Sequence, residues 1–387
     1  MNRSNWTYFP VEKVQIGYDA AESVRRAVTQ RHRSRAFILT SRSLATSKTV
    51  RSIGTLLGER HIGSFDGLRA HVPLTGVLAA ANAARAANAD ALVAVGGGSV
   101  MDAAKLVSMF LRMEIDGPAA FDRFEGFGDR LSGTMYPEDA QEWVRIHAVP
   151  TTLSAAEFTW WAAPLDPERR RRRFVHPYLA PQHVALDPQA TLETPRELFL
   201  STGMKAVDHA VERLAAPGLD LLTELHATRG LEMLGRGLRS VAARPDDLNA
   251  RLDCLTGTAL TMSSPAAGAR VGSSHALGHA LGALLDVPHG LTTGVLLPSV
   301  LRWSRRPDGS GQEHIAQALG DPHAHAADLV ADLVSALGLP GRLRDVGVTR
   351  EDFGRLATRA LSDPVVVGSP RMPDSVDDLV EILEMAW

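Results

Sequence analysis

The sequence predicts an α/β N-terminal half followed by an all-helical C-terminal half. Short apolar runs typical of buried strands recur as far as residue 186, and one of them leads directly into a glycine triplet and a helix. From Thr194 onward the pattern is helical, with almost no strand signal. A chain of 387 residues is long enough for about two domains. We therefore expect an α/β domain over residues 1–188 and a helical domain over residues 189–387.

The composition is that of an ordinary globular protein, with 45% hydrophobic residues, 22% charged residues and a net charge of -3. This balance does not favour nucleic acid or a membrane surface as the main partner. The single cysteine, Cys254, excludes an intrachain disulfide and suits a reducing compartment. No basic-then-apolar leader opens the chain, and no apolar run approaches the ~18 residues of a membrane span. We expect a cytoplasmic protein.

The basic residues are nearly all arginine. Lysine stands only at Lys13, Lys48, Lys105 and Lys205. A lysine that persists against this bias is expected to do something that arginine cannot do.

The first elements alternate between strand and helix. Residues 35–40 form an apolar run that ends in Ser41-Arg42-Ser43, residues 73–87 form an alanine-rich helix, and residues 90–95 form a second buried strand. The second strand runs into Gly96-Gly97-Gly98 and a helix that includes Lys105. Glycine lets backbone N–H groups approach an anion at the positive end of a helix, so this turn predicts a phosphate cradle.

The rest of the α/β half is less regular. Residues 117–142 are a polar excursion rich in Gly, Pro, Asp and Glu, and the five arginines of 169–173 are mostly a solvated face. A strand over 144–149 leads into Pro150-Thr151-Thr152, whose hydroxyls hold a diphosphate or ribose, or else cap a turn. Residues 184–186 form the last strand.

The helical half begins with Thr194 as the expected N-cap and Pro195 at the first helical position. Helical periodicity covers residues 206–215, 221–242, 276–285 and 326–337. Three histidines in a late polar stretch are expected at the surface: His314, His323 and His325.

Three further histidines indicate a site. His275 and His279 lie four residues apart on one face of an apolar helix, and His289 follows after a turn. A single histidine on such a face is usually a core residue with satisfied ring nitrogens. Three within fifteen residues favour a site, because several half-satisfied buried imidazoles are costly.

These motifs, in this order, resemble the iron-containing alcohol dehydrogenase family over most of the chain. The motifs are Gly-Gly-Gly-Ser-x-x-Asp-x-x-Lys at 96–105, Pro-Thr-Thr at 150–152 with Glu157 and Thr159, Gly203-Met204 through Glu212, His275-x-x-x-His279 and Pro288-His289-Gly290. The resemblance implies a Rossmann-like dinucleotide-binding domain and an all-helical domain, an architecture shared with dehydroquinate synthase.

The resemblance also implies NAD or NADP as cofactor and a homodimer as the assembly. It places the dinucleotide at Gly97, Gly98, Ser99, Asp102, Thr151, Thr152 and Thr159, and it puts Arg173 where the family has a lysine near the cofactor. The strand at 35–40 ends in Ser41 and Arg42, without an acid that would repel a 2′-phosphate, so NADPH is permitted.

The metal site departs from the family pattern. The resemblance implies an Asp and three His as ligands of Fe or Zn, with the histidines at His209, His275 and His289, but Lys205 stands where the Asp is expected. Asp208 is adjacent to His209 in sequence and lies about 100° round the helix from it. Asp208 therefore does not simply stand in for the missing Asp. An ammonium has no lone pair and repels a divalent ion, so we expect metal binding to be weakened or absent. The maleylacetate reductase branch, which the chain resembles in its Pro-Thr-Thr-Leu-Ser segment, also lacks this Asp.

We therefore expect an NAD(P)-dependent alcohol dehydrogenase or carbonyl reductase in which Lys205 takes over the charge of the metal. His209, His275, His279 and His289 are the candidates that orient the substrate or relay the proton. The substrate is a small-molecule or peptide-borne alcohol or carbonyl compound. The alternatives are a metal-dependent alcohol dehydrogenase that uses the three histidines, a non-catalytic homologue that keeps the fold, and a lyase of the dehydroquinate synthase type.

Overall fold

The protein is described by a computed structural model that covers residues 11–69, 72–117, 143–164, 172–263, 270–306 and 311–387. The polar excursion expected at 117–142 and Arg169–Arg171 of the arginine run lie almost entirely outside these residues. The described residues divide into two compact units, 11–194 and 195–387. Below they are called the N-terminal unit and the C-terminal unit.

The N-terminal unit is built on one parallel sheet of six strands in the order β1-β8-β5-β4-β2-β3. Its strands are β1 (Lys13–Ile16), β2 (Ala36–Ser41), β3 (His61–Leu68), β4 (Ala91–Gly96), β5 (Arg145–Pro150) and β8 (His183–Leu186). Every residue of β4, β5 and β8 is buried, which explains why these strands consist mainly of apolar residues.

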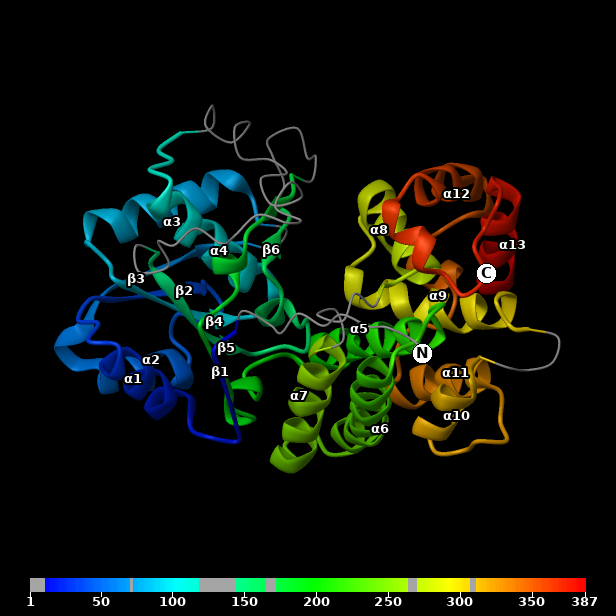
Figure 1. The fold of residues 1–387 in the computed structure, drawn as a ribbon, viewed down its shortest axis with the longest axis horizontal. Coiled ribbons are helices and arrows are strands. Elements are labelled where there is room, and N and C mark those ends of the chain that lie inside the picture. Colours follow the sequence, from blue (N-terminus) through cyan, green and yellow to red (C-terminus); the bar gives the residue numbers. More distant parts are fainter. Residues whose placement is uncertain (1–10, 70–71, 118–142, 165–171, 264–269, 307–310) are drawn as a thin grey trace. The chain divides into compact units, whose positions relative to one another are not determined.

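Helices cover both faces of this sheet, as parallel strands require. Figure 1 shows α1 (Ala20–Gln30) and α2 (Lys48–Leu57) on one face, with α3 (Leu74–Ala86) and α4 (Gly98–Arg112) on the other. A short antiparallel pair, β6 (Trp161–Ala162) and β7 (Phe174–Val175), follows β5. Because parallel strands end at the same edge, the turns after β4 and β5 come together there.

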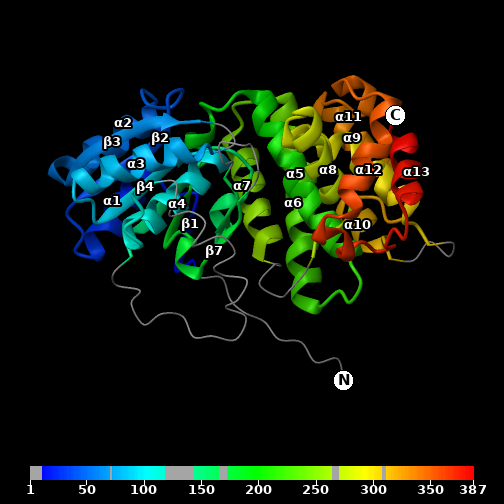
Figure 2. The ribbon, with the colours of Figure 1, turned by 90° about the horizontal axis from the view of Figure 1, so that it is seen from above.

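Helices are the only regular secondary structure among the described residues of the C-terminal unit (Figure 2). Its helices are α5 (Arg196–Ala215), α6 (Leu221–Ala243), α7 (Leu248–Ser263), α8 (Ser273–Leu285), α9 (His289–Trp303), α10 (Glu313–Ala318), α11 (Ala326–Leu337), α12 (Phe353–Leu361) and α13 (Val376–Ala386). One apolar core joins α8, α9, α12 and α13. Among the described helices, none is both long enough and apolar enough to cross a membrane.

The predicted fold class is confirmed, with a parallel α/β unit followed by a helical unit. The predicted start of α5 was wrong. Its N-cap is Pro195, and the Thr194 hydroxyl instead donates a hydrogen bond of 2.7 Å to the carbonyl of Thr151. A buried carbonyl at the end of β5 therefore competes successfully for the side chain that a sequence pattern assigns to the helix.

Candidate active site

The turn between β4 and α4 has room for glycine and for nothing larger. Gly96 has a φ of +157°, and Gly97 is the N-cap of α4. A Cβ on Gly97 would lie 3.0 Å from Cγ2 of Thr152, and a Cβ on Gly98 would lie 2.9 Å from Oγ of Ser154. The two loops at this edge of the sheet are therefore in close contact, which is why glycine is needed here.

Hydroxyl groups at this edge lack partners. The Thr152 Oγ1 and Ser154 Oγ atoms are buried and have no hydrogen-bond partner among the described residues. The Thr151 N–H donates to the carbonyl of Gly96 at 3.0 Å, which ties the two turns together. Buried hydroxyls are normally paired, so a ligand with acceptor oxygens would satisfy both of these groups.

The remaining residues predicted to bind the dinucleotide occupy the same region of the N-terminal unit. Ser99 is half-buried in the first turn of α4. Asp102 and Thr159 both hydrogen-bond to the ammonium of Lys105, at 2.9 and 2.7 Å. Arg173 is exposed, and its guanidinium carbon lies 6.0 Å from the centre of the Trp161 ring.

The C-terminal unit brings the predicted histidines into one row. The ring centres of His209 and His275 are 4.8 Å apart, those of His275 and His279 are 6.3 Å apart, and those of His279 and His289 are 5.6 Å apart. Lys205 precedes His209 by one helical turn on α5 and is half-buried. Three other histidines were expected at the surface. His314 is half-buried, and His323 and His325 are exposed.

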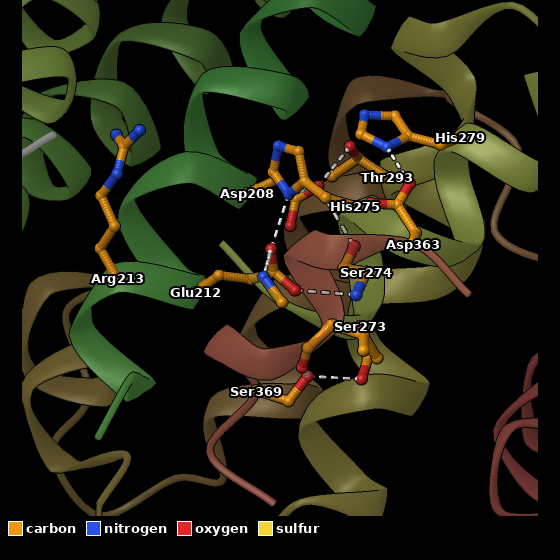
Figure 3. Close-up of polar contacts among 12 residues, drawn as sticks. Asp208, Glu212, Arg213, Ser273, Ser274, His275, His279, Thr293, Asp363 and Ser369 are labelled. Carbon is orange, nitrogen blue, oxygen red and sulfur yellow. Dashed lines mark hydrogen bonds and ion pairs between the residues drawn. The ribbon is translucent and has the colours of Figure 1, made fainter. Parts of the chain in front are cut away.

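Two carboxylates that the sequence reasoning did not select complete this site (Figure 3). Glu212 accepts hydrogen bonds from the Nδ1 of His275 at 2.6 Å, the N–H of Gly272 at 2.8 Å and the N–H of Ser274 at 2.7 Å. Glu212 thereby caps the N-terminus of α8, where the N-cap residue Gly272 has no side chain to do so. Its spacing of seven residues from Lys205 on α5 is the signal that would have found it.

Asp208 also points toward His275, although the helical-wheel argument had set it aside. Its Oδ2 accepts hydrogen bonds from the hydroxyls of Ser274 and Thr293, at 3.1 and 3.0 Å, and lies 3.5 Å from the His275 Nδ1. The partners of Asp208 come from α8 and α9, so its position relative to His209 on α5 does not reveal them.

Burial and one cation set the protonation states. Burial lowers the pKa of His209 well below its usual range, and the charge of Lys205 contributes in the same direction. Burial, followed by the charge of Lys205, lowers the pKa of His275 as well. Burial raises the pKa of Asp208 to about 7 and also raises the pKa of Glu212, whereas the charge of Lys205 opposes both shifts. The charge of Lys205 therefore shifts the pKa values of titratable groups on both α5 and α8.

His279 differs from His275 in its surroundings. Its side chain is 44% exposed, and its Nδ1 lies 2.8 Å from the Oδ2 of Asp363. The Nε2 of His275 and the Nδ1 of His209 are buried and lack a hydrogen-bond partner among the described residues. The row of rings thus runs from two imidazoles that each have a buried ring nitrogen without a partner among the described residues to a ring in contact with water.

Asp208, Glu212 and His275 each offer a possible ligand atom, and these atoms lie within 4.8 Å of one another. His275 and Glu212 already hydrogen-bond to each other, and both carboxylates accept hydrogen bonds from Ser274 on α8. Both oxygens of Glu212 accept backbone N–H groups, and an Nδ1 that donates to Glu212 carries a proton. The trio is therefore a hydrogen-bonded network, in which Oδ1 of Asp208 is a buried acceptor without a partner among the described residues.

Comparison with known proteins gives a consistent result for both units. Residues 11–188 match the family model of iron-containing alcohol dehydrogenase, and residues 199–387 match the C-terminal model of the Fe-containing alcohol dehydrogenase family.

Individual relatives agree with these models. The chain is 30% identical to maleylacetate reductase of Sphingobium indicum (95% of this chain, 93% of the relative). It is also 30% identical to lactaldehyde reductase of Escherichia coli (84% of each chain). A solved 1,3-propanediol oxidoreductase superposes with a TM-score of 0.88 at 25% identity, covering 100% of both chains. The protein therefore belongs to the iron-containing alcohol dehydrogenase family, whose relatives here are alcohol and aldehyde oxidoreductases.

Proposed function

We propose that the protein is an NAD(P)(H)-dependent oxidoreductase that interconverts an alcohol and a carbonyl compound by hydride transfer, with Lys205 in the electrostatic role of the family metal. The observation that carries the proposal is the position of Lys205. It is half-buried, stands where the family resemblance expects an Asp, and its charge acts on His209 and His275.

The N-terminal unit fits a dinucleotide. The glycine turn lets the backbone after β4 lie directly against the loop after β5. The hydroxyls of Thr152 and Ser154, which have no hydrogen-bond partner among the described residues, offer donors to phosphate or ribose oxygens. The first turn of α4 adds backbone N–H groups at its positive end. When bound, the nicotinamide supplies or accepts the hydride.

The C-terminal unit supplies the polar chemistry. An ammonium held close to the substrate carbonyl donates a hydrogen bond to its oxygen and stabilises the alkoxide as negative charge develops there. The Nδ1–H of His275 is directed to Glu212, which leaves the Nε2 as an acceptor that can orient a substrate hydroxyl or relay its proton. His279 and His289 continue the row and offer further relay groups.

The donors present do not fit a divalent ion held in the manner of the family. A cation at Lys205 opposes a second cation beside the same imidazoles, and it contributes no lone pair. The nearby carboxylate Glu212 already accepts three hydrogen bonds. The metal-dependent alternative would rest on His209, His275 and His289, with Oδ1 of Asp208 as a further oxygen donor.

The relatives indicate which substrates to test first. The relatives' names include lactaldehyde reductase and maleylacetate reductase. Small aldehydes and keto acids are therefore the first substrates to test, and a peptide-borne alcohol or carbonyl group is the next class.

The test combines turnover with metal analysis. NADH and NADPH oxidation would be followed with a panel of aldehydes and keto acids, using protein purified in chelator-free buffer and then stripped with chelator. We expect turnover that survives stripping and falls by about 100-fold or more in Lys205→Ala, the scale of losing one group that stabilises an oxyanion. Lys48→Ala, at an exposed lysine, is the matched control.

Three outcomes would contradict the proposal. Unchanged turnover in Lys205→Ala would remove the role of the ammonium. One equivalent of bound Fe or Zn in the wild-type protein would favour the metal-dependent enzyme. Tight nucleotide binding without turnover on any substrate of the panel would favour the non-catalytic homologue.

A further inference from the structure

Lys105 is the most completely enclosed charged side chain near the glycine turn. Its exposure is 0%, and its Nζ lies 2.9 Å from Oδ1 of Asp102, 2.7 Å from Oγ1 of Thr159 and 2.9 Å from the carbonyl oxygen of Trp161. An ammonium has three N–H donors, and three acceptors surround this one. Each donor therefore has one acceptor inside the protein.

These three bonds join two segments that are far apart in sequence. Asp102 lies on α4, one turn before Lys105, whereas Thr159 and Trp161 follow β5. Thr159 in turn donates from its hydroxyl to the carbonyl of Ala156 at 3.0 Å, so its rotamer is held from both sides. Asp102 keeps 22% side-chain exposure, so one side of it still faces outward.

We propose that Lys105 is a positioning residue of the dinucleotide site, which fixes Asp102 and Thr159 in their binding geometry and does not contact the phosphates itself. The proposal rests on the proposed function, because it assumes that the glycine turn holds a dinucleotide. A lysine near a glycine-rich turn commonly binds phosphate directly as a point charge. Here all three donors are already used, which favours the indirect role.

The three acceptors around Lys105 also explain why position 105 keeps a lysine in a chain whose basic residues are nearly all arginine. A planar guanidinium has five donors in a rigid fork, so it would leave at least two of them unsatisfied in a space that holds three acceptors. Lys105→Arg is therefore expected to behave as a loss of function and not as a conservative change.

The experiment measures the Kd of NADH and NADPH by fluorescence titration on the whole protein. The variants are Lys105→Met, Lys105→Arg, Thr159→Val, Thr159→Ser and the double variant Lys105→Met with Thr159→Val. Lys48→Met is the matched control, because it removes an exposed lysine in the same unit. Urea unfolding of each variant is recorded alongside, and kcat is measured at saturating nucleotide.

We expect Kd to rise by about tenfold or more in Lys105→Met, in Lys105→Arg and in Thr159→Val, the scale of one hydrogen bond to a charged group. Thr159→Ser, which keeps the hydroxyl, should raise Kd far less than Thr159→Val does. The double variant should be less impaired than the sum of the two single effects, because part of the effect of the lysine passes through Thr159. In the single variants kcat should change less than Kd.

Other results would overturn the inference. Fully additive effects of Lys105→Met and Thr159→Val would mean that the lysine does not act through Thr159, which contradicts the inference. Wild-type Kd values in a folded Lys105→Met protein would remove its role. If Lys105→Met does not fold, equal Kd values for Thr159→Val and Thr159→Ser would still contradict the inference. Failure of the wild type to bind either nucleotide would overturn the proposed function, and this inference with it.

Discussion

The Oε2 of Glu212 lies 2.6 Å from the Nδ1 of His275, and the same carboxylate accepts two backbone N–H groups at the start of α8. One side chain on α5 therefore both caps the helix that carries His275 and directs the ring of that histidine. Orientation of the imidazole and stability of α8 are coupled through this single carboxylate.

Replacing Glu212 with alanine should lower both stability and activity. The change leaves three buried donors without an acceptor, which we expect to cost about 2–5 kcal/mol in the free energy of unfolding. Urea denaturation measures the loss, and kcat/KM measures the misplacement of His275. Glu197→Ala, at an exposed glutamate on the same helix, should change neither. Equal stability of the two variants would show that the cap is dispensable.

Gly98→Ala should weaken the dinucleotide site. Its new Cβ would lie 2.9 Å from Oγ and 3.1 Å from Cβ of Ser154, so the loop after β5 must move away. Overpacking of this kind costs about 1–3 kcal/mol. We expect a higher Kd for NAD(P)H in fluorescence titration. Gly76→Ala on α3, where the nearest atom is 4.0 Å away, should bind nucleotide normally and gain slightly in stability. A normal Kd for Gly98→Ala would show that Ser154 yields without cost.

Glu157 should make stability fall as pH rises from about 4.5 to 7. Burial raises the pKa of this carboxyl from 4.5 to about 7, so within that window the folded protein holds a proton that the unfolded chain has lost. The free energy of unfolding then decreases with pH by at most about 1.4 kcal/mol per pH unit for this group. Glu157→Gln should remove that component from urea denaturation curves recorded across the window. A slope identical to that of the wild type would mean that the carboxyl is ionised in the folded state.

His147 on β5 should have the opposite influence. Burial lowers the pKa of this imidazole from 6.5 to about 3, so between these values the unfolded chain binds a proton that the folded protein does not. Its contribution to stability is present above pH 6.5 and is lost as the pH falls toward 3. We expect the free energy of unfolding of His147→Leu to fall less steeply on acidification than that of the wild type. Circular dichroism measures this unfolding. His323→Leu, at an exposed histidine, should follow the wild-type curve.

Cys254 should report on unfolding of the C-terminal unit. The thiol is buried on α7, and burial raises its pKa above the ordinary value, which suppresses the reactive thiolate. Alkylation by iodoacetamide at neutral pH should therefore be slow in the native protein and fast in urea, with a midpoint that follows the loss of helix signal. Rapid labelling under native conditions would indicate local opening of α7.

Part of the helical and strand pattern was readable from the sequence, because those elements repeat their apolar residues with the period of their own geometry. The spacing of His275 and His279 and the glycine triplet at 96–98 were readable for the same reason, since both depend on residues close together in the chain. The edge strands β1 and β3 were not placed, because they have few buried residues and no continuous apolar run. The starting residue of α5 could not be read from the sequence, because the Thr194 hydroxyl hydrogen-bonds to a carbonyl 43 residues away in sequence.

By itself the sequence determined the division into an α/β half and a helical half, the glycine turn after β4 and the presence of Lys205 where the family resemblance expects an aspartate. Only the tertiary structure decided that Glu212 and Asp208 converge on His275, and that Lys105 is enclosed by acceptors from two segments. The reason is physical. Local patterns follow from backbone geometry within a few residues, whereas the partner of a buried polar group is set by whichever helix or loop the fold brings beside it.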